Sequence, residues 1–283
     1  MTFRQSILFV LGIALILAAP LWSSKISQVY TKLPANYGFD LDMDHSENNR
    51  FNFDEDWSGS VVSLSNIKNF TEKTTESESL INSSFIAKSI TGATLFDLEQ
   101  KYLVDRYNNH DLPGYVDATG SAYYMFPHHT QKISYQFWPG TFGKSFKMNY
   151  IDTTTIDGLK IYHFRGQDNA IDDTLGYSFL PLVPEKYRAL SKATVDVFIE
   201  PVSGIIINYY DKGVSYYSDS EGHRLWDISQ WSNELKESSI HQMAATASKA
   251  RQTILLHEYM IPFGLLSLGI FLLYKSLPGR DKK

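Results

Sequence analysis

Long uncharged apolar stretches stand near both ends of this 283-residue chain, and they limit what the rest of it can fold into. The first, residues 6–22, has 17 residues, and the second, residues 259–274, has 16 and follows an apolar turn that begins at Thr253. A membrane-spanning helix needs about 17 to 25 mostly apolar residues. We therefore predict transmembrane helices over residues 6–22 and 253–274.

The flanks of the two stretches predict how the chain is oriented. The first stretch could also be a cleaved signal peptide, but Pro20 obstructs a small-residue cleavage motif and favours a retained anchor. Arg4 precedes the first stretch, and four basic residues follow the second: Lys275, Arg280, Lys282 and Lys283. Because cytoplasmic flanks carry excess Lys and Arg, we predict cytoplasmic ends at residues 1–5 and 275–283 and an extracytoplasmic domain over 23–252.

The composition of the central region excludes several functions. Residues 24–251 hold 21 Lys and Arg against 29 Asp and Glu, and such an acidic domain argues against nucleic acid or anionic lipid headgroups as partners. The chain has no cysteine, which excludes disulfides, thiolate metal sites and a cysteine nucleophile. Asn69 in NFT and Asn82 in NSS are possible glycosylation sites of an exported face.

The central region has the pattern of antiparallel β structure. Aromatic residues make up 14% of the chain, and runs rich in Val, Ile, Thr and Phe alternate at period two. Gly158 and Gly204 predict tight hairpin turns in a meander of strands. Residues 166–192 predict a long loop with a short helix over 185–192. Residues 225–252 show helical spacing and predict a helical lead into the second span.

Two groups of residues are metal candidates. His128 and His129 are adjacent, and neighbours in a strand point to opposite faces, so we interpret them as an exposed pair in or beside a turn and keep them only as minor metal candidates. Asp40, Asp42 and Asp44 have the alternation of a calcium loop, but position six would be His45 and position twelve Phe51. We therefore interpret the acidic stretch as a solvated edge.

A series of motifs resembles the porin PorA family, long carried as a domain of unknown function. The motifs are VDR at 104–106, FPHHTQKISYQFW at 126–138, DGLKIYHF at 157–164 and VFIEPVSGIIIN at 197–208. Within them the family-like residues are Asp105, Arg106, Phe126, Pro127, Thr130, Lys132, Tyr135, Trp138, Asp157, Gly158, Tyr162, Phe164, Glu200, Pro201 and Gly204. The family usually continues its Trp with Asp-Pro, whereas this chain has Pro139-Gly140.

The resemblance covers essentially the whole chain and implies one membrane helix at each end. It supplies no catalytic residue. Its strands also look like those of lipoprotein-carrier domains, open half-barrels that wrap a helix or an acyl chain. We therefore expect a mainly β protein with an antiparallel, half-barrel-like ectodomain between two transmembrane helices. In it Phe126, Tyr135 and Trp138 help build the core.

The leading functional hypothesis is a non-enzymatic binding or structural protein of the cell envelope, without a cofactor. Its expected partners are the lipid bilayer and another envelope or membrane protein, or an apolar ligand, and not nucleic acid. One alternative is a metal-assisted envelope hydrolase that uses His128 or His129 with nearby acids. Another is an oligomeric pore lined by the terminal helices, with His257 and Glu258 at its mouth.

Overall fold

The structure, a computed structural model, describes residues 3–88, 91–115, 122–142, 144–174, 176–180, 183 and 185–277. It divides into two compact units, one of residues 1–33 with 248–283 and one of residues 34–247. The first unit is helical, and the second contains the described strands. Residues 278–283, most of the predicted basic tail, lie outside the described residues.

The helical elements include both predicted spans. They are α1 (Phe3–Leu21), the π-helix η1 (Trp22–Ile26), α2 (Ser27–Thr31), α3 (Glu237–Leu255), the π-helix η2 (Leu256–Met260) and α4 (Ile261–Ser276). By length and composition, the helices Phe3–Thr31 and Glu237–Ser276 can each cross a membrane. These two helices contain the predicted spans 6–22 and 253–274.

Small residues bring α1 and α4 close together within the helical unit. A Cβ atom on Gly12 would lie 2.9 Å from the carbonyl oxygen of Gly269, and one on Gly269 would lie 2.8 Å from that of Gly12. Small residues allow such an approach between membrane helices. In the same unit the ring of His257 stacks on Tyr30, with centroids 4.1 Å apart.

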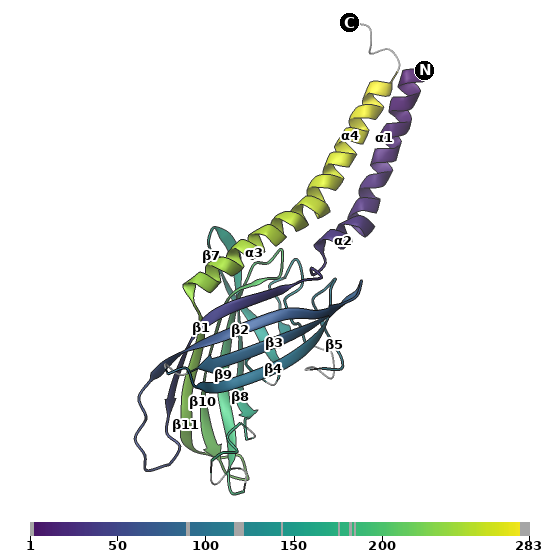
Figure 1. Cartoon of the computed structure of the whole chain (residues 1–283). Coiled ribbons are helices and arrows are strands. Elements are labelled where there is room, and N and C mark those ends of the chain that lie inside the picture. The colour runs from purple at the N-terminus through teal and green to yellow at the C-terminus, as the bar shows by residue number, and fades with distance from the viewer. Residues whose placement is uncertain are drawn as a thin grey trace. The chain divides into compact units, whose positions relative to one another are not determined.

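The strands of the described residues form one antiparallel sheet of eleven members in the order β5-β4-β3-β2-β1-β11-β10-β9-β8-β7-β6 (Figure 1). They are β1 (Gly38–Asn49), β2 (Val61–Thr74), β3 (Glu78–Lys88), β4 (Thr94–Asp105), β5 (Asp111–Leu112), β6 (Tyr135–Phe137), β7 (Phe146–Ile156), β8 (Leu159–Asp172), β9 (Arg188–Ile199), β10 (Ile206–Ser218) and β11 (Arg224–Leu235). The order consists of two meanders, β1 to β5 and β6 to β11, that are joined where β1 pairs with β11. The predicted meander is therefore correct within each half.

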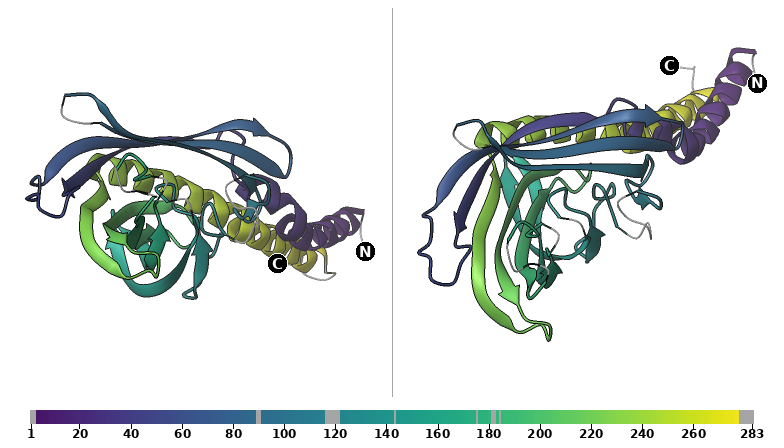
Figure 2. Two further views of the ribbon diagram at one scale, coloured as in Figure 1. Left: turned by 90° about the horizontal axis from the view of Figure 1, so that it is seen from below. Right: turned by 60° about the horizontal axis from the view of Figure 1, so that its bottom comes forward.

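The sheet curves into a half-barrel, as the sequence predicts (Figure 2). Burial alternates along β3, as expected for a strand with one face toward the inside of the half-barrel. Its buried residues are Ser79, Ile81, Ser83, Phe85 and Ala87. The curved sheet surrounds the first turns of α3. The hydroxyl of Ser239 in these turns bonds both the amide and the carbonyl of Asp42 in β1.

A core cluster lies where residues 122–142 pack on β7 to β9. Phe126 and Tyr135 belong to it, as predicted, together with Phe164 and Val197. The ring of Phe126 lies 5.2 Å from that of Phe164 and 5.3 Å from that of Tyr135. Trp138 is only half-buried and contributes to a cavity wall rather than to this cluster.

Two predictions of secondary structure were wrong. Residues 224–235 form strand β11, and the helix begins only at Glu237, because β10 and β1 supply hydrogen-bonding partners on both sides. The helix predicted over 185–192 is absent, since β9 begins at Arg188 and pairs with β10. Around Tyr123 the described residues form only isolated bridges, to His110 and Phe137.

Gly204, in the predicted hairpin turn between β9 and β10, fixes how residues 126–130 dock on the sheet. Its φ is +72°, and a Cβ atom there would lie 2.0 Å from the carbonyl oxygen of Phe126. The amide of Thr130 donates to the carbonyl of Pro201 at 2.8 Å. The turn therefore accepts the Phe126 segment only because residue 204 has no side chain.

Replacing Gly204 by alanine should be far more damaging than the same change at another glycine with positive φ. We expect Gly204→Ala to lower the free energy of unfolding by more than about 4 kcal/mol or to prevent folding, because backbone must move. Gly222 has φ +89° and open space around it, so Gly222→Ala should cost about 1–2 kcal/mol. Thermal unfolding followed by circular dichroism measures both, and equal losses would contradict the docking argument.

Candidate ligand-binding cavity

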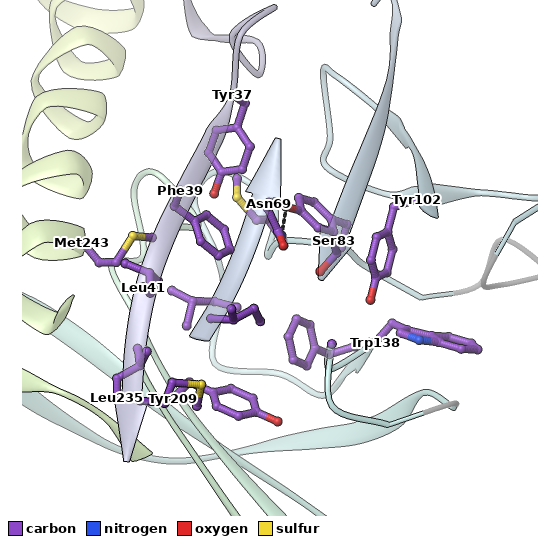
Figure 3. A pocket seen from close by; sticks show the side chains of 17 residues that line it. Tyr37, Phe39, Leu41, Asn69, Ser83, Tyr102, Trp138, Tyr209, Leu235 and Met243 are labelled. Atoms are coloured by element: carbon purple, nitrogen blue, oxygen red, sulfur yellow. Dashed lines mark hydrogen bonds between the residues drawn. The ribbon is translucent and has the colours of Figure 1, made fainter. Parts of the chain in front are cut away.

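An apolar cavity of about 80 Å³ lies inside the β unit (Figure 3). One wall comes from β1 and the residue before it, with Tyr37, Phe39, Leu41 and Met43 at alternate positions of an extended chain. Their spacing of two places all four side chains on one face. The volume is several times the roughly 10–15 Å³ that a water molecule needs.

The opposite side of the cavity comes from segments far away in the sequence. Phe137 ends β6 and Trp138 follows it, while Tyr209 belongs to β10, Leu235 to β11 and Met243 to α3. The cavity therefore exists only when the two meanders and the first turns of α3 are assembled around it. Since Met243 is only 4% exposed, α3 closes this part of the wall.

The described lining contains no Asp, Glu, Lys, Arg or His. Its ionisable side chains are tyrosines, and burial raises the pKa of Tyr37 and of Tyr102 far above the ordinary value. Both hydroxyls are consequently protonated at neutral pH and can donate hydrogen bonds. The cavity therefore suits an uncharged ligand, because an ion would find no opposite charge on its walls.

Three polar atoms of the lining are buried without a hydrogen-bond partner among the described residues. They are the hydroxyl of Tyr37, Oδ1 of Asn69 and Nε1 of Trp138. By contrast, the hydroxyl of Tyr102 donates to Oε1 of Gln100 at 2.7 Å. Nearly all buried polar atoms in proteins are paired, so three unpaired atoms around one cavity require an explanation.

A buried polar cluster adjoins the cavity through Tyr209. The carboxylate of Asp211 accepts bonds from the hydroxyl of Tyr209 at 2.7 Å, from Oγ1 of Thr141 at 2.8 Å and from Nδ2 of Asn233 at 2.8 Å. Because Asn233 donates through Nδ2, its Oδ1 accepts from Nδ1 of His45 at 2.8 Å. Burial raises the pKa of Asp211, and these donors offset only part of that effect.

His45 connects this cluster to a second carboxylate. Its Nε2 lies 3.6 Å from Oε2 of Glu47. Burial alone would lower the pKa of His45, but its interactions with Glu47, Asn233 and Asp211 outweigh burial and raise that pKa. Burial likewise raises the pKa of Glu47, and its interactions with His45 and other neighbours reverse the sign and lower it.

The predicted histidine pair lies in the turn that docks on the β9–β10 hairpin. His128 and His129 are half-buried rather than exposed, and the amide of His129, at φ +55°, donates to the carbonyl of Val202. Across the described part of the chain, no three His, Asp or Glu side chains gather as a metal site would require.

The acidic stretch and the glycosylation sites prove to be alternate positions of strands. Asp40, Asp42 and Asp44 are exposed on the outer face of β1, a central strand and not the expected edge. Asn69 is 5% exposed and faces the cavity, so the folded chain leaves no space for a glycan there. Asn82 lies on the other face of its strand from the buried Ile81.

The family-like residues mostly fix the chain around the core. Glu200 accepts the amides of Val202 and Ser203 within its own turn, and Thr130 donates its hydroxyl to the carbonyl of Pro127. Arg106 donates to the carbonyls of Thr75 and Glu76, and the neighbouring Asp105 accepts the amide of Tyr107. Lys132 lies over the rings of Tyr150 and Tyr162. Asp157, in the turn with Gly158, forms an ion pair with His241.

Comparison with known proteins identifies the family. A model of the family described as porin PorA matches residues 5–277. This chain belongs to the porin PorA family. The match covers nearly the whole chain and confirms the resemblance carried by the motifs. Family membership and the two candidate spans together indicate a protein associated with a membrane of the cell envelope.

Other comparisons add little. No curated protein matches the chain. Among solved structures, it is similar to a DUF1329 family protein from Desulfovibrio piger ATCC 29098, a crystal structure at 1.75 Å. The two chains are 7% identical, and the alignment covers 81% of this chain and 91% of the other with a TM-score of 0.19. That score is too low to support an argument about fold or function.

Sequence reasoning missed the polar atoms of the cavity. The sequence marks Asn69 only as a possible glycosylation site, and it does not single out Tyr37. A usable signal was present, because Asn69 has the same parity as Ile67 and Ser65 in a strand whose alternate residues are apolar or small.

The raised pKa of His45 predicts that stability falls as pH rises. A group whose pKa is higher in the folded state stabilises fully below its unfolded value, here 6.5, and loses that contribution as pH rises through the folded pKa. The raised pKa of Asp211 likewise makes stability fall as the pH rises above 3.8, the ordinary pKa of that group. The contribution of Glu47 to stability is constant above pH 4.5, its ordinary pKa.

We therefore expect the unfolding temperature to be lower at pH 8 than at pH 6 and this difference to shrink in His45→Gln. The matched control is His223→Gln, at an exposed histidine in the turn before β11, which should keep the wild-type difference. Thermal unfolding of the purified chain at both pH values provides the measurement. An unchanged difference in His45→Gln would rule out this histidine as the source.

Proposed function

We propose that this chain is a non-enzymatic, membrane-anchored binding protein of the cell envelope whose β unit holds an apolar ligand. The observation that carries the proposal is the uncharged cavity on the concave side of the half-barrel, lined mainly by aromatic and aliphatic side chains. Ligand sites are typically concave and mostly apolar, with a few placed polar groups. The bilayer is the second partner, through the helices Phe3–Thr31 and Glu237–Ser276.

Apolar burial is the driving force that such a cavity offers. Each methylene group moved from water to an apolar site contributes about 0.8 kcal/mol. Of the lining residues, Phe137 and Met243 are each 4% exposed and Tyr102 1%, so groups beside them are shielded from water. A hydrocarbon chain, or the end of one, is complementary to these apolar walls, whereas a nucleic acid or a charged metabolite is not.

The ligand can be identified by what co-purifies with the full chain. We expect lipid extraction and mass spectrometry of the protein, purified in mild detergent, to reveal an apolar compound that is strongly reduced in Ser83→Leu. Ser83 is 3% exposed and lines the cavity (Figure 3), so leucine there fills the space. Ser84→Leu, on the other face of β3, is the matched control and should keep the compound.

Bilayer lipids that only surround the membrane helices should co-purify in equal amounts with wild type, Ser83→Leu and Ser84→Leu. The proposal fails if no compound distinguishes wild type from Ser83→Leu while both are folded by circular dichroism. Stoichiometric zinc or another transition metal in the purified chain would instead favour the hydrolase alternative.

The proposed topology places both termini in the cytoplasm and the β unit outside. Its basis is the basic residues that flank the spans, Arg4 and Lys275 among them. Protease added to intact cells or spheroplasts should remove the β unit and leave tags on both termini protected. A mature N-terminus near Ser23 would contradict this topology, because the first stretch would then be a cleaved signal.

A further inference from the structure

The three unpaired polar atoms specify the ligand further than its apolar character does. Tyr37 and Asn69 are 9% and 5% exposed, and Trp138 has its Nε1 buried although its ring is half-buried. All three line one cavity. In a folded protein a polar atom that has lost water and gained no partner is rare, and three such atoms around one space suggest a partner that occupies it.

Two of these atoms belong to one corner of the cavity. The edge of the Tyr37 ring meets Tyr124, with centroids 6.3 Å apart, and Nδ2 of Asn69 donates to the hydroxyl of the same Tyr124. If the amide of Asn69 were turned over, its oxygen would accept from Tyr124 and its nitrogen would be unpaired instead. Either orientation leaves one polar atom of Asn69 available beside Tyr37.

The available atoms define a hydrogen-bonding pattern. The indole of Trp138 can only donate, and the hydroxyl of Tyr37 is protonated and can donate or accept. The amide of Asn69 supplies an acceptor in the orientation shown, or a donor when reversed. An ester carbonyl can accept from Tyr37, and a hydroxyl can both donate to Asn69 and accept from Tyr37. A carboxylate, phosphate or ammonium would be buried without a counter-charge.

We propose that the ligand of this cavity carries an uncharged oxygen group, a hydroxyl or an ester, that hydrogen-bonds to Tyr37 and Asn69 while its hydrocarbon portion lies against Phe39, Leu41 and Met243. The proposal rests on the proposed function, because it needs an apolar ligand in the same cavity. The chemical class is therefore a neutral ester or alcohol with a hydrocarbon chain, such as a partial glyceride or a fatty alcohol, and not a free fatty acid.

The test compares four probes with a ten-carbon chain: decane, 1-decanol, methyl decanoate and decanoate. The full chain is reconstituted in nanodiscs of one phosphatidylcholine, and the shift of its unfolding temperature is measured against probe concentration, which yields a dissociation constant. Ser83→Leu in the same nanodiscs corrects for partition of each probe into the bilayer. We expect 1-decanol or methyl decanoate to bind about tenfold more tightly than decane, and decanoate at pH 8 more weakly than either.

Tyr37→Phe separates a binding role from a structural one. It should remove the preference for the oxygen-bearing probe and leave the affinity for decane unchanged. Without probe, the variant should unfold at the same or a higher temperature than wild type, since it loses an unpaired buried hydroxyl. Tyr102→Phe is the matched control, because that hydroxyl is already bonded to Gln100, and it should keep the preference.

Each remaining outcome counts against one statement or the other. Equal affinity for decane and the oxygen-bearing probes in wild type would mean that buried water alone satisfies Tyr37 and Asn69, which overturns this inference and leaves the proposed function standing. Tightest binding of decanoate would overturn it as well. If no probe distinguishes wild type from Ser83→Leu, the proposed function fails together with the inference.

Discussion

The pairing of β1 with β11 is the constraint on which the rest of the β unit depends. These strands come from opposite ends of the unit and run antiparallel from the Met43–Leu235 pair to the Asn49–Ser229 pair. Without this pairing the chain would form two separate meanders, and each would have one more unpaired edge strand. Joined, they form one sheet of eleven strands, and a twisted sheet of that width curls. The half-barrel is a consequence of this one pairing.

A curled sheet has a concave face that must be filled, and here the filling creates the site. Residues 122–142 fill the side of β7 to β9 densely, with Phe126 fully buried. On the side of β1 and β2 the filling comes from α3, whose Ser239 is bonded to Asp42 and whose Met243 reaches the cavity. Packing that is complete on one side and incomplete on the other leaves an apolar space, which protein cores otherwise avoid.

The sequence predicts those parts of the fold that depend on local pattern. The spans, the alternating strands and the turns at Gly158 and Gly204 follow from residues near one another. The strand at 224–235 does not, because Trp226, Trp231 and Leu235 also lie near helical spacing, and only β1 and β10 on its two sides decide the matter. Residues 188–192 were misjudged for the same reason, since their strand character comes from pairing with β10. Long-range hydrogen bonding overrode local propensity in both cases.

The site was harder to predict than the fold, since residue type directed attention to the wrong side chains. His128 and His129 are reactive by type, yet their turn serves to dock the Phe126 segment on Val202 and Pro201. Asn69 has an unreactive side chain, but its inward position on a curved sheet places its amide at the wall of the cavity. The proposed function depends on polar atoms that folding buries without a partner, and only the assembled half-barrel determines which atoms those are.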